Sequence, residues 1–167
     1  MIISVGVVGA GQMGAGIAQV LACAGYQCIV SDLNDQALDL GQKNVFDSLK
    51  KLESKGLLKE NADQIISRIS WCGNISRLSN CGLVIEAVVE HEQVKIGVLK
   101  TLDETLKKDA IIASNTSSIS ITRLASATKR PEQVIGMHFM NPVPLMSLVE
   151  IIRGAKTSAK TVESIET

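Results

Sequence analysis

The N-terminal segment constrains the fold of this chain more than any other part of the sequence. Residues 2–8 are a short run rich in β-branched side chains, which predicts a buried strand. Gly9, Gly11 and Gly14 follow at once in the spacing G-x-G-x-x-G, and apolar residues with helical spacing continue to Ala22. The first glycine permits a tight turn, the second lets a ligand approach the backbone, and the third lets the helix pack close to the strand. The segment therefore predicts a strand, a turn and a helix whose free N–H groups face a phosphate.

An acidic residue follows at about the distance that a dinucleotide site requires. The second apolar run, residues 27–31, ends in Asp32, eighteen residues beyond Gly14. In dinucleotide-binding folds an acid about twenty residues on binds the adenosine ribose. Its carboxylate would accept hydrogen bonds from the ribose hydroxyls and repel a 2′-phosphate, and residues 33–35 contain no arginine to hold that phosphate. We therefore expect NAD rather than NADP, with Gln12 and Met13 beside it. A glycine-rich turn without a ligand is the alternative.

Charge and composition exclude several classes of protein. The 17 basic and 17 acidic residues balance, which argues against a broad surface for nucleic acid or an anionic membrane. No apolar run approaches the length of a transmembrane helix, and the first strand leaves no room for a signal peptide, so we expect a cytoplasmic protein. The 167 residues, 46% of them hydrophobic, predict one domain with an aliphatic core. The cysteines lack C-x-x-C spacing, which indicates reduced thiols and no metal site: Cys23, Cys28, Cys72 and Cys81.

Strand and helix patterns alternate along the rest of the chain. Helical spacing over residues 37–52, a break at Gly56 and a second helical segment at 57–69 predict a helical hairpin after the second strand. This hairpin either packs on the sheet or leans over a substrate. The remaining patterns predict helices at 92–106 and 123–127 and strands near 70–71 and at 83–90, 110–114, 133–138 and 148–152. The alternation predicts an α/β, doubly wound fold with a mostly parallel sheet.

Glycine and polar residues gather at the predicted carboxyl ends of these strands. The glycine turn, Asp32, Glu90, residues 115–118 and His138 each follow or end a strand. Ligands bind at this edge of doubly wound sheets. We therefore expect these segments, which are far apart in the sequence, to converge on one site.

One of the two histidines lies in a segment that predicts catalytic chemistry. His138 ends one apolar run, Glu150 lies in a second, and residues 141–144 (NPVP) must turn, because each proline lacks an N–H and fixes its own φ. Two strands joined in this way would fold Glu150 back toward His138. A carboxylate beside an imidazole fixes its tautomer and steadies its protonated form, so His138 is a candidate general base. A structural histidine with its hydrogen bonds satisfied is the alternative.

Four segments carry a specific resemblance: VGVVGAGQMGAGIAQ, VIEAVVE, ASNTSSISIT and GMHFMNPVPLMSLVEII. Over essentially its whole length, the chain resembles the short-form 3-hydroxyacyl-CoA dehydrogenases, which include the bacterial 3-hydroxybutyryl-CoA dehydrogenases. The resemblance implies a Rossmann-type NAD-binding domain over residues 1–167. It also implies an acyl-CoA thioester as substrate, with the 3-hydroxyl of an L-3-hydroxyacyl-CoA oxidised to a ketone and hydride passed to NAD⁺.

The resemblance also implies roles for individual residues. His138 would take the hydroxyl proton, Glu150 would orient the imidazole, and Ser117 would hydrogen-bond the reacting oxygen. Asn141 would help to shape the substrate site. The dinucleotide positions are occupied by Gly9, Gly11, Gly14 and Asp32.

Three further residues match positions that line the ribose and nicotinamide region of the family: Glu90, Lys95 and Asn115. Simpler interpretations of these residues stay open. Asn115 and Ser117 would serve as helix caps after a strand, Glu90 would be a solvated strand end, and Lys95 would be an exposed helix lysine.

Members of this family continue into a second, all-helical domain, which builds a homodimer and completes the acyl-CoA site. Residues 158–167 resemble the start of the linking helix, so we expect this chain to be the cofactor-binding half. Two other functions stay open. A binding module would hold NAD without catalysis, as crystallin-like relatives of the family do. A dehydrogenase of free hydroxy acids, such as a sugar acid, would catalyse the same oxidation on a substrate that is not a coenzyme A thioester.

Overall fold

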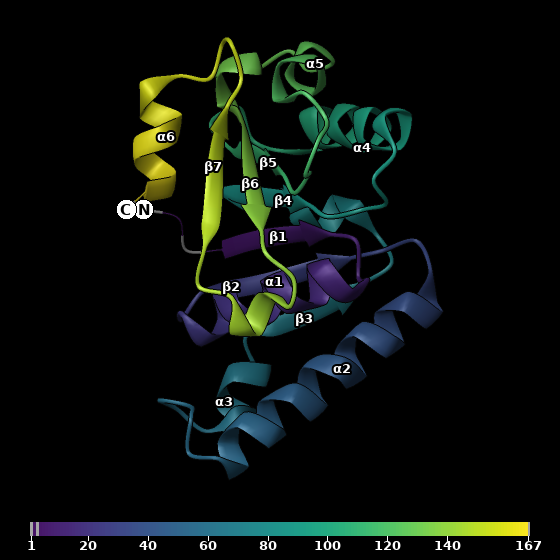
Figure 1. Ribbon diagram of the computed structural model, residues 1–167. Coiled ribbons are helices and arrows are strands. Elements are labelled where there is room, and N and C mark those ends of the chain that lie inside the picture. The colour runs from purple at the N-terminus through teal and green to yellow at the C-terminus, as the bar shows by residue number, and fades with distance from the viewer. Residues whose placement is uncertain (1, 3, 167) are drawn as a thin grey trace.

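A seven-stranded sheet of order β3-β2-β1-β4-β5-β6-β7 forms the centre of the computed structural model, which describes residues 2 and 4–166 (Figure 1). Strands β1 to β6 are parallel, and β7 is antiparallel to β6. The strand order reverses between β1 and β4, which is where such sheets leave a crevice for ligands. The strands are β1 (Ser4–Val8), β2 (Gln27–Ser31), β3 (Ile69–Cys72), β4 (Leu83–Glu86), β5 (Ile111–Ser114), β6 (Val134–Phe139) and β7 (Val149–Arg153).

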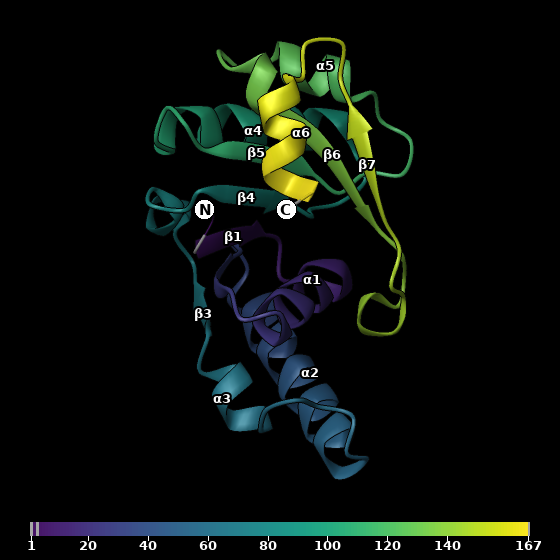
Figure 2. The ribbon, with the colours of Figure 1, turned by 90° about the vertical axis from the view of Figure 1, so that its left-hand side faces the viewer.

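Helices cover both faces of this sheet. They are α1 (Gln12–Cys23), α2 (Asp35–Ser54), α3 (Ala62–Ile66), α4 (Glu92–Thr105), α5 (Ile121–Ser126) and α6 (Ala159–Glu166), with 3₁₀ turns η1 (Ile75–Leu78), η2 (Pro131–Gln133) and η3 (Val143–Leu145). One core packs α1, α2 and α3 on one face, and a second packs η1, α4 and α5 on the other. Helix α6 lies against β6, and the α2–α3 hairpin extends away from the sheet (Figure 2). The predicted doubly wound, mostly parallel Rossmann-type fold is confirmed.

The first strand is buried on both faces, as its unbroken apolar sequence predicts. Val5 and Val7 belong to the first core, whereas Val8 belongs to the second. This burial holds the carboxyl end of β1 rigidly at the centre of the sheet, directly before the glycine turn.

The helical hairpin is present, but its second helix is shorter than predicted. Within residues 57–69 only α3 is helical, because the Asn61 side chain caps its start and the chain leaves the helix at Ser67. Ile69, which was expected to end that helix, begins β3 instead and pairs with Cys28 of β2. The isoleucine spacing suited either structure, and pairing with β2 decided between them.

Strand β4 also ends earlier than predicted. The expected strand covered residues 83–90, whereas β4 ends at Glu86. The Glu86 side chain accepts a hydrogen bond from Val88 N at 2.8 Å, which turns the chain out of the ladder. Residues 87–91 therefore form a loop at the carboxyl edge of the sheet.

Two predicted elements reach residues outside the described part of the chain. The first strand was expected to include Ile3, and the linking helix to include Thr167; both residues lie outside the described set. Within the expected segment of residues 158–167, Ala159–Glu166 form the helix α6. No helix in the described part is long and apolar enough to cross a membrane. Within the same residues, no group of three or more His, Cys, Asp or Glu side chains is placed to hold a metal ion, and the four cysteines are free.

Candidate functional site

The turn between β1 and α1 requires glycine at two positions. Gly9 has a φ of +105°, and a Cβ there would lie 2.6 Å from the carbonyl oxygen of Ala87. A Cβ on Gly14 would lie 1.9 Å from the carbonyl oxygen of Gly9, so the helix packs directly on the turn. Gly11 differs, because no atom lies within 4 Å of its Cβ position. The turn is therefore open on the side of Gly11, as the close approach of a phosphate requires.

The start of α1 and the end of β2 complete this part of the site. No side chain caps α1, whose N-cap is Gly11, so its first N–H groups and positive dipole end are available to an anion. Asp32 Oδ2 accepts from Ala10 N at 2.8 Å, and Asp32 Oδ1 accepts from Asn34 N at 2.9 Å. Each carboxylate oxygen keeps capacity for a further donor, such as a ribose hydroxyl. The turn, the helix and the acid together fit a dinucleotide.

The predicted pairing of His138 with Glu150 is present. The antiparallel register of β6 and β7 places the two residues opposite each other, and His138 Nδ1 lies 2.8 Å from Glu150 Oε2. This contact makes Nδ1 the protonated nitrogen of the neutral imidazole and leaves Nε2 to exchange a proton with a ligand. The intervening turn contains the cis peptide bond between Asn141 and Pro142, and η3 packs beside α1. The His138 side chain is 23% exposed and so remains accessible.

A cavity of about 330 Å³ brings the predicted residues together at the carboxyl edge of the sheet. Its walls come from α1 and from the ends of β4, β5 and β6 with the loops that follow them. The predicted residues that line it are Met13, Glu90, Asn115, Ser117, His138 and Asn141. Glu150 reaches the cavity only through His138, and Gln12 lies beside it, with its Nε2 donating to Asn141 Oδ1 at 3.1 Å. Glu90, Asn115, Ser117 and His138 thus lie together as expected, whereas Asp32 and the three glycines do not line this cavity.

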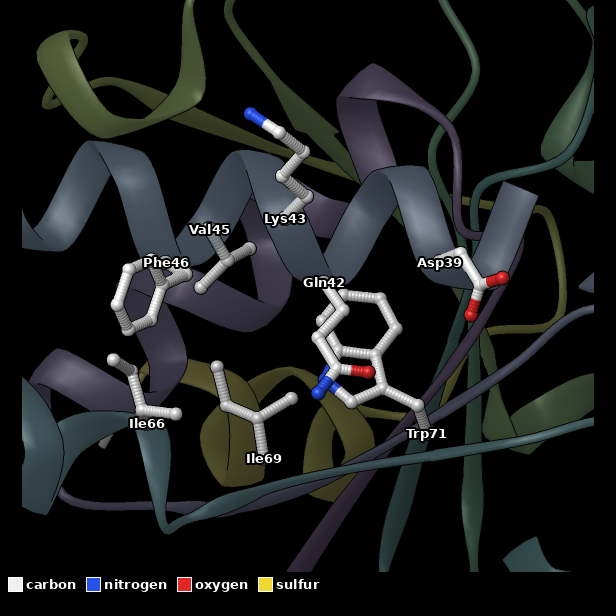
Figure 3. A pocket seen from close by; sticks show the side chains of 8 residues that line it. All are labelled: Asp39, Gln42, Lys43, Val45, Phe46, Ile66, Ile69 and Trp71. Carbon is white, nitrogen blue, oxygen red and sulfur yellow. The ribbon is translucent and has the colours of Figure 1, made fainter. Parts of the chain in front are cut away.

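A second cavity of similar size, about 350 Å³, lies between α2 and the ends of α3 and β3 (Figure 3). Side chains of α2, α3 and β3 line it, with Phe46 and Trp71 among them and Lys43 pointing away from the apolar groups. None of the predicted catalytic or cofactor residues lines this cavity. We therefore place the candidate site in the cavity that contains His138.

Glu90 is fixed by the loop after β5 and is more than a solvated strand end. Its Oε1 accepts from Thr116 Oγ1, from Ser117 N at 3.1 Å and from Ser117 Oγ at 3.4 Å. Partial burial alone would raise the pKa of Glu90, but the Thr116 hydrogen bond and the charge of Lys95 outweigh it and hold the pKa below its ordinary value. Glu90 is therefore an anion held in the cavity wall.

Lys95 was expected either to line the cofactor site or to be an exposed helix lysine, and the structure shows neither. Its side chain is 0% exposed, so it is not an exposed helix lysine, and it does not line the cavity. Its Nζ lies 2.8 Å from Glu86 Oε1 and 3.4 Å from Glu90 Oε2, and it donates to the carbonyl oxygen of Asn115 at 3.2 Å. The buried face of α4 directs Lys95 at the ends of β4 and β5. Any influence on a bound cofactor therefore passes through Glu90, Asn115 and Val88, whose carbonyl oxygen Lys95 Nζ also contacts at 3.4 Å.

Neither Asn115 nor Ser117 caps a helix, because the N-cap of α5 is Ser120. Asn115 Oδ1 accepts from Phe139 N at 3.0 Å, which ties the end of β5 to the residue after His138. Ser117 lines the cavity together with His138. Asn115 thus positions the histidine strand, while Ser117 lies in the cavity with its Oγ 3.4 Å from Glu90 Oε1.

One buried residue of this region was missed from the sequence. Glu86 is fully buried at the end of β4, beside Lys95 and Ser114. The available signal was an acid within the apolar run of residues 83–89, because a charge buried in a core requires a partner. The position of that partner could not be read from the strand alone.

Comparison with known proteins agrees with this geometry. The chain matches the family described as "3-hydroxyacyl-CoA dehydrogenase, NAD binding domain" over residues 4–167. It is 50% identical over 156 residues to a probable 3-hydroxybutyryl-CoA dehydrogenase of Deinococcus radiodurans, covering 93% of this chain and 56% of that protein. It is also 50% identical over 161 residues to the 3-hydroxybutyryl-CoA dehydrogenase of Bradyrhizobium diazoefficiens, covering 96% and 55%.

Solved structures give the same result. The crystal structure of the (S)-3-hydroxybutyryl-CoA dehydrogenase from Ralstonia eutropha superposes with a TM-score of 0.96 at 44% identity, over 99% of this chain and 59% of that one. The chain thus spans about half the length of the relatives that it matches. The chain belongs to the 3-hydroxyacyl-CoA dehydrogenase family and comprises its NAD-binding domain.

Proposed function

We propose that this chain is the cofactor-binding half of an NAD-dependent dehydrogenase that oxidises L-3-hydroxyacyl-CoA, such as 3-hydroxybutyryl-CoA, to the 3-ketoacyl-CoA. The observation that carries the proposal is the His138–Glu150 pair, 2.8 Å between Nδ1 and Oε2, in a cavity that Ser117 also lines. A base held beside a dinucleotide turn is what alcohol oxidation requires, because the hydroxyl group loses its proton as its carbon loses hydride.

In the proposed reaction His138 accepts the hydroxyl proton at Nε2. Glu150 holds the Nδ1–H and stabilises the imidazolium that forms. Ser117 turns its single hydroxyl hydrogen from Glu90 Oε1, 3.4 Å away, to the reacting oxygen. Asn141, held by Gln12, shapes the substrate side of the cavity. The bound cofactor supplies the hydride acceptor.

The cofactor in this proposal is NAD, held along the carboxyl edge of the sheet. Gly9, Gly11 and Gly14 form the pyrophosphate turn, with Gln12 and Met13 beside it, and Asp32 binds the adenosine ribose. The Asp32 carboxylate, with no arginine at residues 33–35, disfavours the 2′-phosphate of NADP. Glu90 and Asn115 line the nicotinamide end, and the buried Lys95 contacts both on the side away from the cavity.

The substrate and the assembly belong to the same proposal. The relatives named above act on 3-hydroxybutyryl-CoA by their names, so we infer an acyl-CoA thioester as the partner of this cavity. We further propose that the complete protein is a homodimer, assembled through a helical domain beyond this chain. Four free cysteines and a net charge of zero suit a reducing, cytoplasmic location and give no support to a nucleic-acid or membrane partner.

The test is oxidation of NADH that depends on acetoacetyl-CoA. The full-length protein should turn over, and His138→Gln should lower kcat by about 10²–10⁴-fold, the usual contribution of a general base. NADH affinity should be unchanged, because the substitution leaves the glycine turn and Asp32 intact. Full turnover in the variant would refute the assignment of the base. Turnover of free 3-hydroxy acids in place of thioesters would refute the substrate assignment.

A cofactor-binding module without catalysis is the second candidate for the chain as given. It is favoured by the finding that the chain spans only about half of its relatives. The same assay on the 167-residue chain separates the two candidates. NADH binding without turnover would support the module, whereas turnover would show that the remaining part of the relatives is dispensable for the chemistry.

A further inference from the structure

Glu86 and Lys95 form a buried ion pair behind the candidate site. Among the ion pairs that the described residues make with one another, it alone has both side chains 0% exposed. The pair lies between the end of β4 and the inner face of α4, and neither residue lines the cavity. Glu86 therefore cannot touch a substrate or cofactor, although it lies directly beneath the residues that do.

Every polar atom of this pair has a partner. Glu86 Oε1 accepts from Lys95 Nζ and from Val88 N, both at 2.8 Å, and Glu86 Oε2 accepts from Ser114 Oγ at 2.6 Å. Lys95 Nζ also donates to the carbonyl oxygens of Asn115 at 3.2 Å and Val88 at 3.4 Å. One carboxylate and one ammonium thus connect the ends of β4 and β5 and the loop after β4.

These contacts hold two walls of the cavity that contains His138. The first wall is the loop after β4: Val88 is bound at both its N–H and its carbonyl, and the adjacent Ala87 carbonyl packs on the Gly9 turn. The second wall begins at Asn115, whose carbonyl is held by Lys95 while its side chain binds Phe139 N.

A buried ion pair is a weak source of stability, because the desolvation of both charges offsets most of their attraction. Apolar residues of similar volume would pack β4 against α4 equally well. The charged pair adds a fixed geometry, because each oxygen and each N–H must meet its partner at a defined distance and angle. These contacts lie next to residues that line the cavity, so the geometry that they fix is that of the cavity wall.

We propose that Glu86 is a positioning residue for the nicotinamide end of the cofactor site. It acts through Lys95 and the Val88 backbone to hold Glu90 and Asn115 in place. The inference rests on the proposed function, because it requires that a nicotinamide cofactor binds against this wall of the cavity. Glu86 itself makes no contact with the ligand.

The test replaces Glu86 by glutamine in the 167-residue chain. Glutamine keeps the size of the side chain, and its Oε1 can still accept from Lys95 Nζ and Val88 N. Its Nε2 can only donate to Ser114 Oγ, so that contact reverses its direction, and the substitution removes the negative charge that holds Lys95. Affinity for NADH is measured by fluorescence titration, and affinity for ADP-ribose, which lacks nicotinamide, by competition. We expect Glu86→Gln to weaken NADH binding about tenfold and ADP-ribose binding by no more than about twofold. The larger effect lies within the range that coupled residues of one network show.

Asp103→Asn is the matched control. Asp103, in the last turn of α4, pairs with Arg130; their side chains are 6% and 10% exposed, and neither lines the cavity. This variant should lower the unfolding temperature and leave both affinities unchanged. If Glu86→Gln behaves like the control, or weakens ADP-ribose as much as NADH, Glu86 is only structural and the inference is overturned.

A second variant, Ser114→Ala, tests the inference in case Glu86→Gln does not fold. Ser114→Ala removes only the hydrogen bond to Glu86 Oε2 and should weaken NADH about two- to threefold, while ADP-ribose stays unchanged. Unchanged NADH affinity in Ser114→Ala, with Glu86→Gln unfolded, would count against the inference. A wild-type chain that fails to bind NADH would overturn the proposed function as well. Normal wild-type binding with an unaffected Glu86→Gln would overturn the inference alone.

Discussion

Replacing Gly14 by alanine should destabilise the chain, whereas the same change at Gly11 should not, although both glycines belong to one turn. A Cβ at residue 14 would lie 1.9 Å from the Gly9 carbonyl oxygen, and ordinary contact begins near 3.4 Å. Gly9 cannot move away easily, because its φ is +105° and its N–H donates to Ser31 O at 2.8 Å. A Cβ at residue 11 meets nothing within 4 Å.

The sizes of the two effects follow from these contacts. Overpacking costs about 1–3 kcal/mol, and a backbone carbonyl as the obstacle places Gly14→Ala near 3 kcal/mol. For a chain of this length, about 3 kcal/mol lowers Tm by about 6–12 °C. Gly11→Ala gains about 0.4–1 kcal/mol from a less flexible unfolded chain. It loses about 0.5–1.5 kcal/mol because alanine is a poor N-cap, so the net change is small.

Thermal unfolding followed by circular dichroism, combined with NADH titration, separates stability from binding. Gly11→Ala should keep its Tm and lose at least about tenfold in NADH affinity, or about 1.4 kcal/mol, because its methyl group occupies the open side of the turn. Gly97→Ala in α4 is the control: its Cβ also meets nothing within 4 Å, and NADH affinity should not change. A Gly14→Ala variant as stable as the wild type would refute the packing argument. A Gly11→Ala variant that binds NADH normally would refute the phosphate assignment.

Three further outcomes are expected. Glu150→Gln in the full-length protein should lower kcat by about 10²–10⁴-fold with NADH affinity intact, because Glu150 reaches the cavity only through His138; equal kcat would contradict its orienting role. Asp32→Ala should weaken NADH binding about tenfold or more, because charge-assisted hydrogen bonds to the ribose are lost. Parallel titrations should also show a smaller ratio of NADH affinity to NADPH affinity than in the wild type. An unchanged ratio would count against the ribose assignment. The pKa of Glu90 is lowered in the folded chain, so its carboxylate stabilises the fold above the unfolded value of about 4.3, and this contribution is lost as pH falls through the folded pKa. In urea unfolding at several pH values, the stability difference between wild type and Glu90→Gln should therefore shrink below about pH 4, and a difference that is constant with pH would contradict the argument.

Much of the fold was predictable because its signals are local. The glycine spacing at residues 9–14, the β-branched run before it and the acid at Asp32 specify a strand, a turn and a helix within a short stretch of chain. The His138–Glu150 contact was predictable for the same reason, since a proline-rich turn between two apolar runs leaves few ways to place the second run. Errors appeared where one pattern suited two structures, as at Ile69, which pairing with β2 placed in β3 rather than in a helix.

The sequence by itself determined the doubly wound arrangement, the dinucleotide turn and the His138–Glu150 contact, because periodicity and turn chemistry act between residues close in the chain. Only the tertiary structure decided the environment of Lys95, which lies on a helix with charged neighbours yet is fully buried. Its side chain contacts Glu86, at the end of β4, and the carbonyl oxygen of Asn115, directly after β5. The convergence of these strand ends is a property of the packed sheet, and no local pattern states which side chains meet there.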